Sequence, residues 1–417
     1  MVISMVGGPV NIAFIALCVL LLKLRNKDTE MLAGLWFVCT MSDSRLLIFS
    51  SFEQAKYVYI VLMTFFLVFN IRRFVPLSKF YLRFLPFMAV AFYCLLHSPV
   101  FAVSFSKTVS YLFLLFTIPS YVNKCYRDDG YDFIKLFIYV GLFVLLIGLL
   151  LKIFLPLSVS FEARFRGLLG NPNGMGLYCL VLFLMFVLMN RSLPDLFHRQ
   201  EKLIFYTLVF LSIFLSGSRN SIAAILIYIM FSYLTRISPL LGFLMLLFIL
   251  AGYEYININI VAVVKSLGAQ SYFRTETLSN AAGRYIAWKL AWDNITKDIF
   301  LGRGFEYTNY LFNLNQKSLN DFGHQGNAHN SFLTFWLDTG LGGLLLYLYA
   351  FVASFIRAAG KQKVVIAALF AIFFSAFFES YLTSSLNPYM IIIILFLTVL
   401  TSNEILPGKT EAIISVH

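Results

Sequence analysis

The residues best suited to acid–base chemistry lie near residue 329, where a long polar segment meets an apolar helix. His329 begins this junction and His324 is a nearby competitor, whereas His97, His198 and His417 lie in weaker contexts. A histidine titrates near neutral pH and can accept a proton from a hydroxyl group. We predict that His329 is a general base. The alternative is a histidine at a helix start whose polar atoms are satisfied by the backbone.

Five arginines fall on the same predicted side of a membrane as His329: Arg164, Arg166, Arg219, Arg284 and Arg303. A guanidinium group is permanently charged and binds phosphate oxygens through a planar fork. Basic residues are concentrated on the opposite, cytoplasmic side of membrane proteins. Five arginines on the outer side therefore need a reason, and a bound polyanion supplies one. For any one arginine, the alternative is contact with a lipid headgroup or a carboxylate.

Further polar residues accompany these cations. Asn173 lies at the start of a helix whose dipole and free amides would add to anion binding. Glu379 and Asp338 are acids in apolar segments, where acids usually face a cavity or a partner. Either acid could orient the histidine or an arginine, or simply neutralise a buried charge. The predicted catalytic residues are His329, Arg284, Arg219 and Arg164, and the predicted substrate contacts are Arg166, Arg303, Asn330, Asn173 and Glu379.

Several common motifs are absent from the sequence. It has no Walker-type phosphate loop, no Gly-x-Gly-x-x-Gly, no Asp-x-Asp and no His-Glu-x-x-His. A nucleotide or a metal-bound nucleotide sugar is therefore not the expected substrate. We predict a site that uses no metal and no cofactor, with one base and several fixed cations.

The composition indicates how these residues are held. Hydrophobic residues make up 60% of the chain, charged residues only 12%, and the mean hydropathy is +0.83. A soluble domain carries about 25% charged residues. The fold class is therefore all-α, a polytopic membrane bundle of 12 or 13 helices. We expect helices near 8–23, 31–50, 56–71, 82–101, 106–121, 134–156, 173–190, 202–216, 220–235, 238–253, 329–355, 364–382 and 388–402. The second helix is interrupted by Asp43 and Arg45.

The net charge of +12 does not indicate nucleic acid binding, because the basic residues lie in short connectors between apolar runs. Under the positive-inside rule these connectors face the cytoplasm, and one alternating topology satisfies all of them. The carboxyl terminus is then inside, and the loops at 157–172 and 254–328 are outside. The five cysteines lie in or beside predicted helices and form no disulfide framework or zinc motif.

The whole chain, residues 1–417, is expected to form a single transmembrane domain with one long outer loop at 254–328. A loop of this length is usually functional or disordered. Within 284–299 the apolar residues recur at spacings of three and four, which predicts an amphipathic helix with a stripe of Tyr285, Trp288, Trp292, Ile295 and Ile299. We therefore expect this loop to fold over the bundle as a lid on the site.

The chain resembles the bacterial O-antigen ligase and polymerase superfamily over residues 160–385. The resemblance rests on four motifs in order: Arg-x-x-Gly followed by Gly-Asn-Pro-Asn from Arg164, Ser-Arg at Ser218, Arg-x-x-x-Trp at Arg284 with a following Gly-x-Gly, and His-Asn with Gly-x-x-Gly from His329. The arginines at 164 and 166 both stand near the first motif, and the spacing to Gly167 favours Arg164. Asp338 stands where similar sequences often carry glutamate, so it is given no catalytic role.

The resemblance implies an integral-membrane glycosyltransferase of the bacterial inner membrane with its active site on the periplasmic face. The donor would be a glycan on undecaprenyl pyrophosphate. The arginines would neutralise the departing pyrophosphate. His329 would deprotonate or orient the acceptor hydroxyl in one inverting displacement. Membrane lipid, a flippase and a chain-length regulator of the same pathway would be its partners.

The acceptor separates two readings of this resemblance. A polymerase adds the growing glycan to a lipid-linked repeat unit, and a ligase transfers it to lipid A–core or protein. The Phe-, Tyr- and Leu-rich composition favours the polymerase. A third hypothesis, from another class, is a flippase or transporter of lipid-linked sugar. Transporters tend to show paired repeats and broken helices near the midplane, and no internal repeat is evident in this chain.

Overall fold

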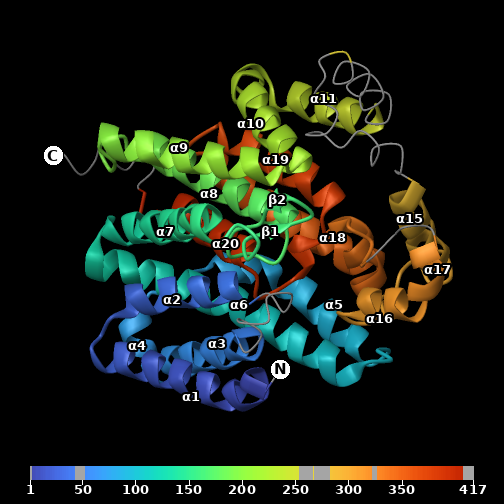
Figure 1. The fold of residues 1–417 in the computed structure, drawn as a ribbon, viewed down its shortest axis with the longest axis horizontal. Helices are drawn as coiled ribbons and strands as arrows, with labels where there is room; N and C mark the ends of the chain where they lie inside the picture. The colour runs from blue at the N-terminus through green and yellow to red at the C-terminus, as the bar shows by residue number, and fades with distance from the viewer. Residues whose placement is uncertain (1, 43–51, 253–265, 267–281, 322–325, 407–417) are drawn as a thin grey trace.

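The computed structural model describes residues 2–42, 52–252, 266, 282–321 and 326–406 (Figure 1). The described part is helical except for one two-stranded hairpin. Its elements are α1 (Val2–Leu24), α2 (Asp28–Met41), α3 (Phe52–Phe69), α4 (Ile71–Phe74), η2 (Phe80–Phe84), α5 (Leu85–Leu95), α6 (Phe101–Asp129), α7 (Asp132–Phe154), β1 (Ser160–Phe161), β2 (Arg164–Phe165), α8 (Pro172–Ser192), α9 (Arg199–Ser216), α10 (Arg219–Ile237), α11 (Pro239–Ala251), α15 (Ala282–Ile295), α16 (Tyr307–Leu314), α17 (Gln316–Asp321), α18 (Ser331–Ala359), α19 (Val365–Phe378), η3 (Tyr381–Thr383) and α20 (Pro388–Thr401).

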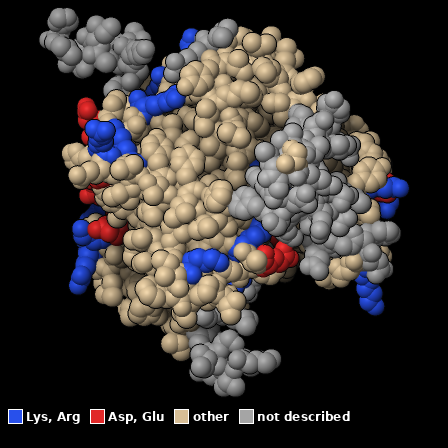
Figure 2. All heavy atoms as spheres, turned by 45° about the horizontal axis from the view of Figure 1, so that its top comes forward, with Lys and Arg blue, Asp and Glu red and all other residues tan. Residues whose placement is uncertain are grey.

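The architecture confirms the predicted all-α membrane bundle. Each of the thirteen expected apolar segments overlaps a described helix. Among the described residues, five helices are long and apolar enough to cross a membrane: α3, α6, α7, α8 and α18. Charged side chains form a few groups on the face drawn in Figure 2, and the surface between them is largely uncharged. This is the surface that a bilayer favours.

Several helix boundaries differ from the predictions, and two of these differences concern the carboxyl ends of α2 and α6. The helix expected at 31–50 ends at Met41, and Asp43 and Arg45 lie outside the described residues. The helix expected at 106–121 is α6, which continues to Asp129 past Pro119. Polar residues such as Asn123 and Lys124 ended the apolar pattern in the sequence, but both are buried against neighbouring helices. A hydropathy pattern does not register a polar helical turn that packs inside the bundle.

The helix α20 forms the centre of the bundle. All of its residues except Tyr389 are buried, and it packs against α2, α6, α8 and α18 (Figure 1). The Trp36 indole NH donates to the Pro388 carbonyl at 3.1 Å, and the Trp36 ring stacks on Tyr178. The first turn of α20 is thereby held firmly next to the ends of α2 and α8.

The helix predicted at 284–299 is confirmed as α15, which ends at Ile295 and packs against α18. The predicted stripe was wrong in part. The buried residues are Ala287, Ala291 and Ile295, whereas Tyr285 is 69% exposed and Trp292 is 49% exposed. Ala287 and Ala291 let α15 approach α18 closely, and the larger side chains of Tyr285 and Trp292 remain exposed. Most of residues 254–281 lie outside the described part, so the lid stays a prediction.

Candidate active site

The first component of the site is Arg164, which the β1–β2 hairpin presents. The hairpin turns at Glu162 and Ala163, both with left-handed φ values of 48° and 61°. The Arg164 guanidinium donates to the backbone carbonyls of Ser216 at 2.7 Å and Gly217 at 3.2 Å. It thereby binds the carbonyl end of α9, where a helix dipole favours a cation.

A bridge of side chains connects this arginine to Glu379. Arg164 donates to the amide oxygen of Asn173 at 3.0 Å, and the Asn173 amide nitrogen donates to Glu379 Oε1 at 3.2 Å. Asn173 lies in the first turn of α8, and Asn171 caps that helix through the Gly174 NH. The cap fixes the turn that carries Asn173, and this one side chain joins segments 206 residues apart.

Glu379 is the carboxylate at the centre of the site. It follows the last turn of α19, its side chain is only 13% exposed, and its Oε2 lies 3.5 Å from His329 Nδ1. Burial alone would raise the pKa of this carboxyl. The hydrogen bond and charge of His329, the charge of Arg284 and the Asn173 amide outweigh burial and hold the pKa of Glu379 below its usual value. Glu379 is therefore ionised at neutral pH.

His329 is held by its own backbone as well as by Glu379. Its φ of 44° is left-handed, which is uncommon for a residue with a side chain. The His329 NH donates to Asn327 Oδ1 at 2.9 Å, and Ser380 Oγ donates to the same oxygen at 3.2 Å. Gly326 leaves room for the ring, because a Cβ there would lie 3.2 Å from His329 Nε2. A strained backbone with dedicated hydrogen bonds is typical of functional sites.

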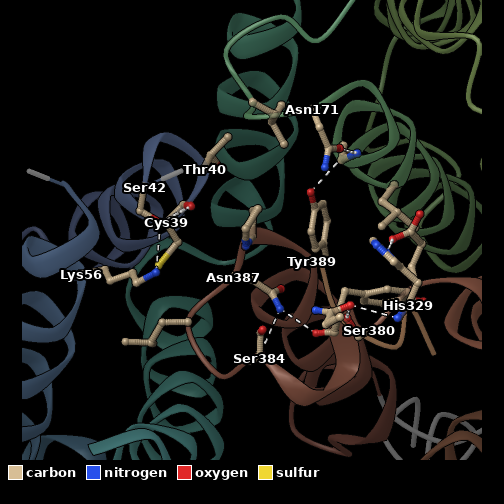
Figure 3. A pocket seen from close by; sticks show the side chains of 18 of the residues that line it. Cys39, Thr40, Ser42, Lys56, Asn171, His329, Ser380, Ser384, Asn387 and Tyr389 are labelled. Atoms are coloured by element: carbon tan, nitrogen blue, oxygen red, sulfur yellow. Dashed lines mark hydrogen bonds and ion pairs between the residues drawn. The ribbon is translucent and has the colours of Figure 1, made fainter. Parts of the chain in front are cut away.

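These groups border a cavity of about 540 Å³, into which His329 and Glu379 both project. Figure 3 shows His329 and Ser380 on one wall and Cys39, Ser42 and Lys56 on the other. The rest of the polar lining comes from amides and hydroxyls: Thr40, Asn171, Asn309, Asn327, Tyr381, Ser384, Asn387 and Tyr389. Many hydrogen-bonding groups of this kind suit a carbohydrate better than an apolar ligand.

Lys56 is a lining residue that the sequence analysis did not single out. It lies in the second turn of α3, and its ammonium contacts Ser42 Oγ at 3.5 Å and the Tyr57 ring at 5.6 Å. Within the described part of the chain Lys56 forms no ion pair. The available signal was a lysine on the outer side of the predicted topology, where basic residues are unexpected.

The other predicted arginines are distributed unevenly. Arg284 on α15 lies with its guanidinium 5.7 Å from the centre of the Phe378 ring and is close enough to Glu379 to influence its charge. Arg219 follows the turn that Arg164 holds, but its side chain is exposed. Arg166 donates to the Ser158 carbonyl, and Arg303 is exposed and stacks on Tyr307. The structure therefore joins Arg164 and Arg284 to His329 through Glu379, whereas the contacts described for Arg166 and Arg303 are with Ser158 and Tyr307.

Two further predicted residues have structural partners. Asn330 is buried and caps α18, since its side-chain oxygen accepts from the NH groups of Phe332 and Leu333. Asp338 accepts from the NH and hydroxyl of Thr308 and from the NH of Glu306, and so anchors the start of α16. Neither side chain is among the residues that line the cavity of His329, so both have structural roles. His324 lies outside the described residues.

Part of the chain matches a known protein family. Residues 204–348 match a family described as O-antigen ligase, which confirms the predicted resemblance to the O-antigen ligase and polymerase superfamily. The matched range contains Arg219, Arg284 and His329, whereas Arg164, Asn173 and Glu379 lie outside it. A comparison with curated protein sequences gave no match.

Proposed function

From the premise that this chain carries an O-antigen ligase domain, we propose that it transfers a glycan from undecaprenyl pyrophosphate to an acceptor hydroxyl. The observation that supports this proposal is the linked series Arg164–Asn173–Glu379–His329 at the wall of a polar cavity. It combines a proton acceptor, a carboxylate that orients it and a fixed cation. These are the groups that glycosyl transfer to a hydroxyl requires.

His329 is the proposed base. With its Nδ1–H directed at the ionised Glu379, the imidazole carries its lone pair on Nε2. The acceptor hydroxyl gives its proton to Nε2 as its oxygen attacks the anomeric carbon. The bond from that carbon to the pyrophosphate oxygen breaks, and the leaving group departs on the opposite face with the electron pair. The sugar configuration inverts. Glu379 stabilises the imidazolium that forms.

Cations around the cavity would stabilise the departing pyrophosphate. Arg284 lies beside Glu379, and Lys56 lines the opposite wall. Arg164 already binds two carbonyls and Asn173, so we assign it the positioning of Asn173 and Glu379. Fixed positive groups in a partly dehydrated site can supply this stabilisation without reorganising during the reaction.

The acceptor remains a choice between two proposals. We favour the polymerase, in which the acceptor is a lipid-linked repeat unit, on the Phe- and Tyr-rich composition. The family description favours the ligase, in which the acceptor is lipid A–core. In either case we propose a site on the periplasmic face of the inner membrane.

A deletion strain tests the function and the acceptor together. Loss of a polymerase should leave a single repeat unit on lipid A–core, and loss of a ligase should leave free lipid-linked polymer. Complementation with the wild-type gene should restore the glycan, and complementation with the His329→Ala variant should not. A deletion strain with unaltered surface glycans and unaltered lipid-linked intermediates would contradict the proposal.

A further inference from the structure

An apolar groove of about 560 Å³ runs between α3 and α6. Apart from Ser106 and Ser110, its lining over most of its length is hydrophobic or aromatic, and several of these side chains are exposed: Tyr57, Val61, Val103 and Phe105. These residues belong to the first three turns of α3 and the first two turns of α6, and Lys56 in the same part of α3 lines the polar cavity. The groove therefore lies in the half of the bundle that contains the candidate active site.

The polar end of this groove is an ion pair. The Lys107 ammonium on α6 contacts the Glu306 carboxylate, and Asn309 donates to the other Glu306 oxygen. Both charged side chains line the groove. An ordinary lipid-facing groove would contain no such pair, because charges are costly in hydrocarbon and usually mark a functional path.

The same pair also borders the active site. A small polar cavity has Lys107 and Glu306 in its wall together with Asn309, Asn327, Ser380 and Ser384. Those last four residues line the large cavity of His329 as well. The Lys107–Glu306 pair is thus the boundary between a lipid-facing groove and the site of the proposed chemistry.

Lys56 provides a cation at this boundary. It lies one helical turn before Ile60 and next to Tyr57, both of which line the groove, while Lys56 itself lines the polar cavity. Burial raises the pKa of Glu306, but the charge and hydrogen bond of Lys107 outweigh burial and lower it. The charge of Lys56 lowers the pKa of Glu306 further. A ligand chain in the groove would therefore place an attached anionic head near the Lys56 ammonium, whose described contacts are Ser42 Oγ and the Tyr57 ring.

We propose that the α3–α6 groove binds the hydrocarbon chain of a prenyl-diphosphate-linked substrate, with Lys56 as a contact for its diphosphate. The ligand class follows from the juxtaposition of a long apolar groove, a cation and a hydroxyl- and amide-rich cavity. Each part of a lipid-linked sugar meets a matching part of the site. This inference rests on the proposed function for the identity of the sugar-bearing substrate, but the groove and its cation are independent of the reaction.

Photolabelling of the purified full chain in nanodiscs tests the proposal directly. The probe is a long-chain prenyl diphosphate with a diazirine in its chain, and labelled peptides are identified by mass spectrometry. Labels should concentrate in the segments 57–61 and 102–113. Val61→Trp should fill the groove and reduce this labelling. Leu150→Trp on α7 is the matched control, since Leu150 is 44% exposed, Val61 is 50% exposed, and Leu150 lines neither groove nor cavity.

The head-group contact is tested by charge. Lys56→Gln should weaken labelling by the prenyl diphosphate roughly tenfold, as expected for the loss of one charge-assisted hydrogen bond. It should not weaken labelling by a prenyl alcohol of the same length. Labels spread evenly over lipid-facing helices, or equal competition by phosphatidylglycerol and unlabelled prenyl diphosphate, would overturn the proposal. Unaltered glycans in the deletion strain combined with specific labelling would refute the proposed reaction and leave the lipid site standing.

Discussion

The two ends of α2 lie beside two groups of charged side chains that differ in their balance of cations and anions. At its first residue, Asp28 lies 3.0 Å from both Lys23 and Lys124, and Lys124 also pairs with Asp128. At its other end, Cys39, Thr40 and Ser42 line the cavity of His329. A helix of 14 residues is about 20 Å long, so both arrangements belong to the same region of the bundle.

The difference lies in the balance of charge. The group of Lys23, Asp28, Lys124 and Asp128 has two cations and two anions that pair with each other. The candidate active site instead has the one carboxylate of Glu379 beside the guanidinium of Arg284, with the ammonium of Lys56 on the facing wall. A balanced group stabilises the fold without a ligand. An excess of cations around a cavity indicates an anionic ligand, because like charges are otherwise costly to bring together.

The largest expected effect is on chemistry at His329. His329→Ala should lower glycan transfer by roughly 10²–10⁴-fold, as typical for loss of a general base. Membrane insertion and thermal stability should stay near wild type, because the side chain lies at a cavity wall and is 34% exposed. The measurement is transfer per mole of purified protein. His97→Ala, a change at an exposed histidine beside Tyr93, is the control. Full activity in His329→Ala would end the base hypothesis.

A substitution in the balanced group of Lys23, Asp28, Lys124 and Asp128 should lower the stability of the protein and leave its activity unchanged. Asp28→Asn leaves Lys23 without a carboxylate and weakens the Lys124 pairing, with side-chain exposures of 11% and 9% for the two lysines. Breaking a buried pair of this kind should cost about 3 kcal/mol of unfolding free energy. Activity per folded molecule should be unchanged.

Thermal unfolding in detergent measures this difference, and Lys27→Gln is the control. Lys27 pairs with Glu30 at the surface, with exposures of 57% and 40%, so its loss should hardly change the melting temperature. A loss of activity in folded Asp28→Asn would show that the two groups are not as separate as the charge balance indicates.

A smaller loss is expected from Arg284→Lys. The change keeps the charge but removes the planar fork and the stacking on Phe378. A partly dehydrated cation–π contact contributes up to about 2 kcal/mol, so transfer should fall by roughly tenfold to thirtyfold. Arg303→Lys, the same change at an arginine stacked on Tyr307, should cost less. Equal losses of transfer in both variants would indicate that Arg303 also contributes to the active site.

The smallest expected effect is that of a chelator. Transfer by the purified protein should survive EDTA, since we assign charge neutralisation to Lys56 and Arg284 rather than to a divalent cation. The assay compares initial rates with EDTA, without it and with added Mg²⁺. Strict dependence on Mg²⁺ or Mn²⁺ would show that the pyrophosphate is neutralised in another way.

Much of this protein could be predicted from the sequence because membrane insertion depends on local hydrophobicity. A run of about 20 apolar residues is expected to cross a bilayer as a helix, and the basic connectors predict which end of each helix faces the cytoplasm. That logic placed His329, Arg164 and Arg284 at one end of the bundle. The helix caps at Asn171 and Asn330 also depend only on neighbouring residues.

Only the tertiary structure decided which of these residues meet. His329 and Glu379 are 50 residues apart, Asn173 and Glu379 are 206 apart, and Lys56 faces them from α3. The spacing to Gly167 favoured Arg164 over Arg166, but only the structure shows what distinguishes them: Arg164 is held in the network, whereas the Arg166 guanidinium binds the nearby Ser158 carbonyl. Hydropathy and spacing describe one helix at a time. The face that each helix turns to its neighbours is set by side-chain packing across the bundle, which no local pattern contains.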